Sequence, residues 1–485
     1  MKVTEKKVFK DFDRLKINVK ECYEKNKLNE AIEYARVAAK LMYYFNFIYT
    51  DDDLENFIKL FSKKVFQEDK FFVENEYENR VVFYDYFSLD NRGLSEQYLR
   101  ALVDLNYEIL YITLQHDKTK MVGIKTILEE NKNNKIYFVS SKDSVEKIKE
   151  IREQILKYKP SKIFNHTVPE DICGMVALEN IGNKIERYLI NLTDHAFWLG
   201  KSCSDYFIEF RSYGKNISKY YRKIEEEKSI ILPYYPIENK NIEFQGFPFE
   251  IKNKKLIFSG GSLYKIYGSE VFFELVRYIL DNHKDTIFLY LGNGDSKPIE
   301  KFIRNNKYEN RFYYYKERKD INEVFKRCYF YLGTYPVTGA LMSQFAVVNK
   351  KIPLQYSDKE ILCNRIEELF INSENIKFTF GNIEEIKEEI DKLICSKKYF
   401  EKKSNELNKM VITPLEFSKQ LEKLLKCKKT DFKYEDYSIN IKKFSQIYLE
   451  QENKFLKQYL NIFSNKVLKK KFLHYYLLKK LKKFI

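Results

Sequence analysis

Apolar side chains in the first 76 residues have the spacing of amphipathic helices. Ala31, Ala35, Ala38, Met42 and Phe45 recur every three or four positions. This pattern predicts a helical extension at the start of the chain. A single pair of helices is too little to indicate a repeat array.

The acidic run Asp51-Asp52-Asp53 has two interpretations. It matches the Asp-x-Asp pattern of some metal sites, but that motif should follow a buried strand. Here the acids precede an apolar helical pattern, where they favour the helix dipole, and Thr50 with Asp53 resembles a capping box. We therefore expect a helix start and no metal.

From Arg80 the pattern changes to short apolar runs that alternate with helical segments. The expected strands are 81–87, 108–114, 136–139, 162–164, 187–192, 206–210 and 230–232. Such alternation predicts a parallel sheet covered on both faces, with ligands at the carboxyl ends of its strands. The polar residues expected at that edge are Asp90, Arg92, Gly93, His166, Asp194 and His195.

A second alternating unit follows Pro233-Tyr234-Tyr235-Pro236 and a polar stretch. Its expected strands are 256–259, 286–291, 312–315, 328–332, 354–356 and 378–380. The fold class is therefore α/β, with two Rossmann-like domains facing a cleft, an N-terminal helical extension and a helical C-terminal tail. The expected domains are 1–76 (extension), 77–235 (first Rossmann-like domain), 236–254 (linker), 255–430 (second Rossmann-like domain) and 431–485 (helical return and basic tail).

Composition narrows the class of protein. The 485 residues are 44% hydrophobic with only 15 Gly and 9 Pro, which indicates a folded protein. The seven Cys form no CxxC pair, so we expect a reducing cytoplasm. The net charge is +16, but Lys466 to Ile485 alone carries eight Lys and no acid. Because that excess is local, we expect no nucleic-acid partner.

Three turns of the second unit have residues suited to an anionic ligand. They are Ser259 to Lys265, Gly292 to Asp295, and Thr338-Gly339, which precedes an apolar helix. Glycines allow the backbone to approach a ligand, and Thr338 is a good N-cap for a helix whose free N–H groups suit a phosphate. An ordinary strand-to-helix turn remains the alternative. Neither GxGxxG nor GxxxxGK[ST] occurs here, which counts against a nicotinamide dehydrogenase or a P-loop hydrolase.

The order of these motifs resembles that of GT-B glycosyltransferases, especially bacterial enzymes of surface-glycan assembly. The resemblance covers about residues 80–430. It is carried by Asn91-Arg92-Gly93, by Leu192 to Gly200, by Ser259 to Lys265 and by Thr334 to Ala346. It implies a nucleotide sugar as substrate, with UDP as the expected nucleotide, and neither a cofactor nor a metal.

The resemblance also assigns roles to residues. The second domain would hold the donor through Ser259, Gly260, Gly261 and Lys265 at the phosphates, Tyr315 and Lys316 by the base, and Thr338, Gly339 and Ala340 at the diphosphate. Asn91, Arg92 and Gly93 would lie on the acceptor side. The acceptor would be a glycan, a lipid-linked sugar or a protein.

The expected reaction inverts the configuration at the anomeric carbon of the sugar, because Gly333 to Lys350 lacks the glutamates that many retaining relatives carry. Inversion needs a general base. We favour His195, which has Asp194 beside it, over His166 and Asp90. A structural role for His195, anchoring Phe197-Trp198, is equally compatible with the sequence.

The tail alternates Lys with Leu, Phe and Tyr without separate faces. We expect weak, salt-sensitive contact of residues 466–485 with an anionic membrane, at the inner face of the cytoplasmic membrane. No run of 18 apolar residues and no signal peptide is visible. Two alternatives to an enzyme are a catalytically silent subunit of the same fold and, from charge alone, an RNA-binding protein.

Overall fold

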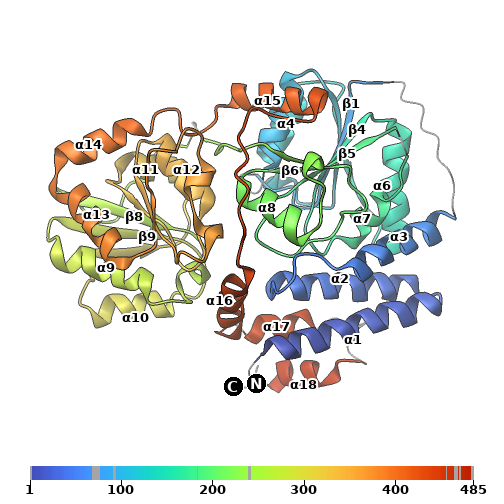
Figure 1. Cartoon of the computed structure of the whole chain (residues 1–485), viewed down its shortest axis with the longest axis horizontal. Coiled ribbons are helices and arrows are strands. Elements are labelled where there is room, and N and C mark those ends of the chain that lie inside the picture. The colour runs from blue at the N-terminus through green and yellow to red at the C-terminus, as the bar shows by residue number, and fades with distance from the viewer. Residues whose placement is uncertain are drawn as a thin grey trace. The chain divides into compact units, whose positions relative to one another are not determined.

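The computed structural model describes residues 3–67, 77–90, 94–182, 184–238, 242–454, 456–463, 468 and 471–481. The chain divides into two compact units. Unit 1 contains residues 1–232, 414–438 and 448–485, and unit 2 contains residues 233–413 and 439–447. Figure 1 shows the chain coloured by residue number, from blue at the N-terminus to red at the C-terminus.

Unit 1 is built on a seven-stranded parallel sheet with the order β3-β2-β1-β4-β5-β6-β7. The strands are β1 (Arg80–Asp85), β2 (Glu108–Thr113), β3 (Lys135–Phe138), β4 (Lys162–His166), β5 (Glu186–Ile190), β6 (Tyr206–Glu209) and β7 (Ser229–Ile231). Each lies within one of the expected apolar runs or overlaps it, because strands buried on both faces are continuously apolar.

Helices cover this sheet. They are α4 (Ser95–Asp104), α5 (Val122–Glu129), α6 (Ser144–Tyr158), α7 (Ile172–Leu178) and α8 (Ser212–Tyr221). α4 packs against α5, and α6 against α7. The strand order reverses between β1 and β4, so the loops after these two strands diverge and leave room at their carboxyl ends.

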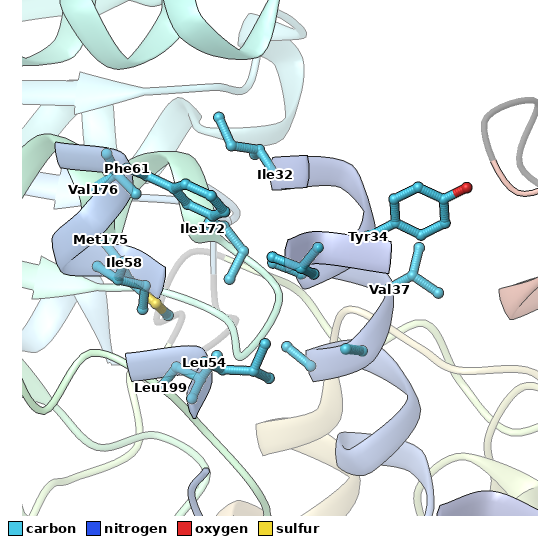
Figure 2. Packing of buried hydrophobic residues seen from close by; sticks show 14 of the residues in the cluster. Ile32, Tyr34, Val37, Leu54, Ile58, Phe61, Ile172, Met175, Val176 and Leu199 are labelled. Carbon is cyan, nitrogen blue, oxygen red and sulfur yellow. The ribbon is translucent and has the colours of Figure 1, made fainter. Parts of the chain in front are cut away.

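The helical extension forms part of unit 1. It contains α1 (Glu5–Glu24), α2 (Leu28–Tyr44) and α3 (Asp52–Phe66). Figure 2 shows Ile58 and Phe61 of α3 packed toward Ile172 and Met175 of α7, in one apolar core that also includes α2. The expected separate domain 1–76 is therefore continuous with the core of the first Rossmann-like domain.

The acidic run is a helix start, as expected. The Asp51 carboxylate accepts a hydrogen bond from the Leu54 N–H at 2.9 Å and caps α3. Lys16 reaches both Asp51 and Asp53, at 3.0 and 2.8 Å. The cap is thus Asp51 rather than Thr50.

Unit 2 has a six-stranded parallel sheet with the order β10-β9-β8-β11-β12-β13. Its strands are β8 (Lys255–Gly260), β9 (Thr286–Leu291), β10 (Phe312–Tyr315), β11 (Tyr331–Leu332), β12 (Pro353–Tyr356) and β13 (Thr379–Phe380). Its helices are α9 (Val271–Asn282), α10 (Lys297–Asn305), α11 (Ile321–Arg327), α12 (Ala340–Val348), α13 (Ile383–Cys395) and α14 (Lys397–Glu406). The order reverses between β8 and β11.

The C-terminal segment returns to unit 1. α15 (Pro414–Cys427) packs against α4, so the expected domain boundary at residue 430 is wrong and the change of unit falls at 413/414. After α16 (Ile441–Lys454), α17 (Leu456–Ile462) and α18 (Leu473–Leu481) pack on the helical extension. Their Tyr459 and Tyr475 hydroxyls both donate to the buried Asp11 carboxylate. Within the described residues, no helix is long and apolar enough to span a bilayer.

Candidate functional site

In unit 2 the candidate site lies where the strand order reverses. β8 and β11 are neighbours, and the loops that follow them contain Ser259 to Lys265 and Gly333 to Gly339. Because α/β sheets bind ligands at the carboxyl ends of strands beside such a reversal, these loops occupy the position expected of a binding site. The Val337 N–H donates to the Lys265 carbonyl at 3.3 Å, so the two loops contact each other.

The glycines after β8 and β9 are required by the close approach of two backbones. A Cβ added to Gly292 would lie 1.9 Å from the Gly261 carbonyl oxygen, and one on Gly260 would lie 2.9 Å from the Leu291 carbonyl oxygen. Gly261 also has a φ of +139°, which side chains rarely adopt. These glycines therefore shape the loops, and Gly292 packs against the first loop.

The loop that leads into α12 is fixed by two side chains that sequence analysis missed. The Thr338 hydroxyl donates to Gln355 Oε1 at 2.7 Å, and Gln355 Nε2 donates to the Thr334 carbonyl at 3.0 Å. Asn364 Nδ2 donates to the Pro336 carbonyl at 2.9 Å and its Oδ1 accepts from the Thr338 N–H at 3.3 Å. The only signal for Gln355 was a polar residue inside an apolar run, and Asn364 had none.

The expected N-cap role of Thr338 is wrong. α12 begins at Ala340 with Gly339 at the cap and no side-chain cap bond, because the Thr338 hydroxyl is held by Gln355. Within the described residues, the N–H groups of Gly339, Ala340 and Leu341 have no hydrogen-bond partner. They remain available to an anion at the positive end of the helix dipole.

Lys265 lies beside this helix start. Its Nζ donates to the Thr338 carbonyl at 3.2 Å, and no carboxylate within the described part of the chain pairs with it. Burial lowers the pKa of Lys265 to about 8. A partly desolvated ammonium next to free N–H groups is an arrangement that a bound anion would stabilise.

The other expected donor residues surround the same loops. Ser259 is fully buried at the end of β8, and its hydroxyl has no partner within the described residues. Tyr315 ends β10, is half-buried, and accepts from the Gly292 N–H at 3.0 Å through its carbonyl. Lys316 follows and is exposed.

In unit 1 the reversal point holds a buried polar network. Asp85 at the end of β1 pairs in register with His166 at the end of β4, and their carboxylate and Nδ1 are 3.0 Å apart. Ser95 at the start of α4 donates to Asp85 at 2.5 Å. Burial opposes ionisation of Asp85, but His166 and these hydrogen bonds hold its pKa below the usual value. His166 Nε2 is buried and unpartnered within the described residues. Sequence analysis missed both Asp85 and Ser95. Asp85 lay inside the predicted strand 81–87, and nothing in the local pattern singled out Ser95.

His195 and Asp194 lie in the loop after β5. The His195 side chain is 30% exposed, and its Nδ1 is 3.2 Å from Asp194 Oδ1. Arg211 binds the same carboxylate with two nitrogens, at 2.6 and 3.2 Å. Burial would raise the pKa of Asp194, but Arg211 and His195 lower it to about 2. Asp194 is therefore a permanent carboxylate that orients the imidazole.

The remaining acceptor-side residues fall around the loop after β1. Both oxygens of Asp90 accept backbone N–H groups of α5, from Gly123 at 2.9 Å and Ile124 at 3.0 Å, so this carboxylate holds a helix start. Asn91, Arg92 and Gly93 lie outside the described residues. Among the described residues, no group of three His, Cys, Asp or Glu side chains gathers as metal ligands would.

Comparison with known proteins places this architecture. No family model and no curated protein matches the chain. Many solved structures are similar to it, among them the following three. A glycosyltransferase from Rickettsia africae ESF-5 has 14% identity and a TM-score of 0.53, covering 71% of this chain and 97% of that one. A mutant Thermobaculum terrenum O-GlcNAc transferase has 10% identity and a TM-score of 0.53, covering 88% and 79%. Anabaena HepE in complex with UDP and glucose has 11% identity and a TM-score of 0.51, covering 72% and 100%.

At these identities the likeness establishes the fold. The chain has two Rossmann-like domains of the GT-B type, the fold of the glycosyltransferases among its structural neighbours. The expected fold class is confirmed in its two parallel α/β domains and its helical N- and C-terminal segments.

Proposed function

We propose that this protein transfers a sugar from a nucleotide sugar, with UDP as the nucleotide, to a glycan, a lipid-linked sugar or a protein. The observation that carries the proposal is Lys265, a partly buried ammonium with no carboxylate partner in the described structure, beside the unbonded N–H groups that open α12. A diphosphate supplies the negative charge that this arrangement lacks. The HepE structure, which contains UDP, lends support at the level of the fold.

The proposed donor site uses residues from three loops of unit 2. Ser259, Gly260, Gly261 and Lys265 would approach the phosphates, with Gly339 and Ala340 presenting N–H groups to the diphosphate and Thr338 holding the loop through Gln355. Tyr315 and Lys316, at the end of the neighbouring strand, would lie by the base.

The proposed reaction is a displacement with inversion. The acceptor oxygen forms a bond to the anomeric carbon while the bond from that carbon to the diphosphate oxygen breaks, and UDP leaves with the electron pair. The acceptor proton passes to His195, which Asp194 orients and which reaches solvent, unlike the buried His166. Lys265 and the helix N–H groups stabilise the departing diphosphate, so the proposed reaction needs no metal.

Two further proposals concern place and partners. Cytoplasmic nucleotide sugars would be the donors, and α18 would contact an anionic leaflet weakly, at the inner face of the cytoplasmic membrane. Phe472 and Tyr475 are buried against the body, whereas Leu473 and Leu477 are each 49% exposed one helical turn apart. A small apolar face in a Lys-rich segment suits salt-sensitive attachment.

Turnover of a panel of nucleotide sugars tests the activity. Release of nucleoside diphosphate that depends on an added acceptor, with a new glycosidic bond detected by mass spectrometry, is the expected result. UDP binding without turnover under any acceptor would instead indicate a silent binding subunit. Isomerised nucleotide sugar as the product would contradict transfer.

A further inference from the structure

A cavity of about 710 Å³ lies in unit 1, away from the edge that carries His166. It is lined by the first residues of β1 and β2, by β3, by the turn before β3 and by the C-terminal turn of α6. In a parallel sheet these are the amino ends of the strands, whereas Asp85 and His166 end β1 and β4. The cavity is therefore separate from the site described above, and its volume is that of a small-ligand pocket.

The charges lining this cavity are mostly positive and unpaired. Arg80 contacts Glu108 at 3.0 Å, which neutralises both. The other cations are Lys132, Lys135 and Lys157, and none of them has an acidic partner within 4.0 Å in the described part of the chain. Three cations remain without counter-charge around one cavity, which favours an anionic ligand.

Tyr158 adds a neutral hydrogen-bond donor at the cavity wall. It is 9% exposed, and its hydroxyl has no hydrogen-bond partner within the described residues. Burial raises the pKa of Tyr158, so the phenol keeps its proton at any physiological pH. The Arg80 guanidinium lies 5.4 Å from the centre of its ring. A buried hydroxyl without a partner costs free energy that a ligand oxygen would recover.

The lining also contains groups that suit sugar hydroxyls. Gln154, Lys157 and Tyr158 occupy one face of α6 at helical spacing, so an amide, a cation and a phenol lie side by side. Across the cavity, Asn133 is held by Glu108, to which its Nδ2 donates at 2.9 Å. Amide and hydroxyl groups both donate and accept, as sugar hydroxyls do.

We propose that this cavity binds an acidic sugar segment, one that carries carboxylate or phosphate groups, of the glycan on which the protein acts. The anionic groups would meet Lys132, Lys135 and Lys157, and Tyr158 would donate to one of their oxygens. The choice of a glycan over other anions rests on the proposed function. Binding a growing chain away from its reacting end would keep the acceptor associated between transfers.

Binding of a defined hexasaccharide to the full chain tests this proposal. The probe is a hexasaccharide of alternating glucuronic acid and N-acetylglucosamine, compared by calorimetry with the same hexasaccharide after reduction of its carboxylates to alcohols. A sugar-phosphate hexasaccharide distinguishes the two sources of charge. We expect the acidic forms to bind, and the reduced form to bind at least about tenfold more weakly, since three lysines each contribute a modest ionic interaction.

Matched variants distinguish the cavity from general electrostatics. Lys132→Ala/Lys135→Ala/Lys157→Ala should lower the affinity about tenfold or more. Tyr158→Phe should also lower it about tenfold or more, as for a lost hydrogen bond to a charged group. The control Lys120→Ala/Lys125→Ala/Lys149→Ala removes the same charge from lysines that pair with Asp117, Glu129 and Glu146. It should bind like the unaltered chain.

Three outcomes would overturn the proposal. They are equal binding of the acidic and reduced hexasaccharides, an equal loss in the control variant, and tighter cavity-dependent binding of a single-stranded RNA of the same charge. UDP binding is measured on the same samples and should be unchanged in every variant. Absence of UDP binding would remove the proposed transfer activity while leaving the hexasaccharide result readable.

Discussion

Glu209 and Asp194 are two buried carboxylates that approach the same glycine from different elements. A Cβ on Gly214 would lie 2.5 Å from Glu209 Oε2 and 2.9 Å from Asp194 Cβ. Burial raises the pKa of Glu209 to about 7, and the charge of Asp194 adds to the rise. Arg211 instead holds the pKa of Asp194 at about 2 against the effect of burial. Of these two carboxylates, only Glu209 therefore titrates near neutral pH.

Glu209 should make the folding stability of unit 1 depend on pH. Between its ordinary value of 4.5 and about 7, the folded chain keeps the Glu209 proton while the unfolded chain has lost it. Stability contributed by this group is complete below the unfolded pKa and falls by about 3 kcal/mol as pH rises to about 7. Glu209→Gln should flatten that part of the profile in urea unfolding at pH 5 to 7.5. Glu227→Gln, at an exposed carboxylate, is the control; a slope that survives in Glu209→Gln contradicts the assignment.

Lys265→Ala should weaken UDP binding by about 1–3 kcal/mol, the range for losing a charged hydrogen bond. Because the pKa of Lys265 is about 8 in the free protein, UDP affinity should also fall as pH rises from 7 to 9. The variant should lose that pH dependence. Calorimetry across this range measures both effects. Lys284→Ala, exposed at the amino end of β9, should behave like the unaltered chain, and a Lys265→Ala protein that binds UDP normally would exclude this placement.

His195→Ala should lower kcat by about 10²–10⁴ and leave UDP affinity nearly unchanged, as for loss of a general base. His166→Ala serves as the comparison, since His166 is buried against Asp85 and its loss should reduce stability more than chemistry. Steady-state kinetics and thermal unfolding of both variants separate the two effects. A large kcat loss in folded His166→Ala, with His195→Ala fully active, would transfer the role to His166.

Leu473→Ser/Leu477→Ser should reduce sedimentation with anionic vesicles at low salt, and high salt should release the unaltered chain. These two side chains are exposed, so the change spares the contacts of Phe472 and Tyr475 with the body. Leu415→Ser alters a 65% exposed leucine of α15 in the same unit and is the control. Undiminished sedimentation of the double variant would show that α18 is not the point of attachment.

Strands and helices could be predicted from the sequence wherever the spacing of apolar residues determines them. The apolar runs from Val81 onward became strands because both faces of a parallel sheet are buried. The fixed polar contacts were not predictable, since Asp85 meets His166 only through the pairing of β1 with β4. Thr338 shows the same limit, because a contact with Gln355 overrode a local capping preference.

The unit against which a late helix packs could not be predicted from its own sequence either. α15 has one apolar face, and nothing in its own sequence indicates whether that face packs on unit 1 or unit 2. The structure places Phe417 against Tyr98 of α4, with ring centres 5.1 Å apart. Two of the motifs that carry the GT-B resemblance, Ser259 to Lys265 and Thr334 to Ala346, nevertheless follow neighbouring strands at the reversal point of the unit 2 sheet.

The return of α17 and α18 to the helical extension determines when unit 1 can complete its core during synthesis. Unit 2 has nearly all of its residues once residue 413 has been made. The apolar faces of α1 and α2, by contrast, stay uncovered until Tyr459, Phe463 and Phe472, which lie far downstream in the chain, have been translated. A ribosome that stops before these residues therefore releases a chain whose first helices expose an uncovered apolar surface. Chains of this kind are prone to aggregate.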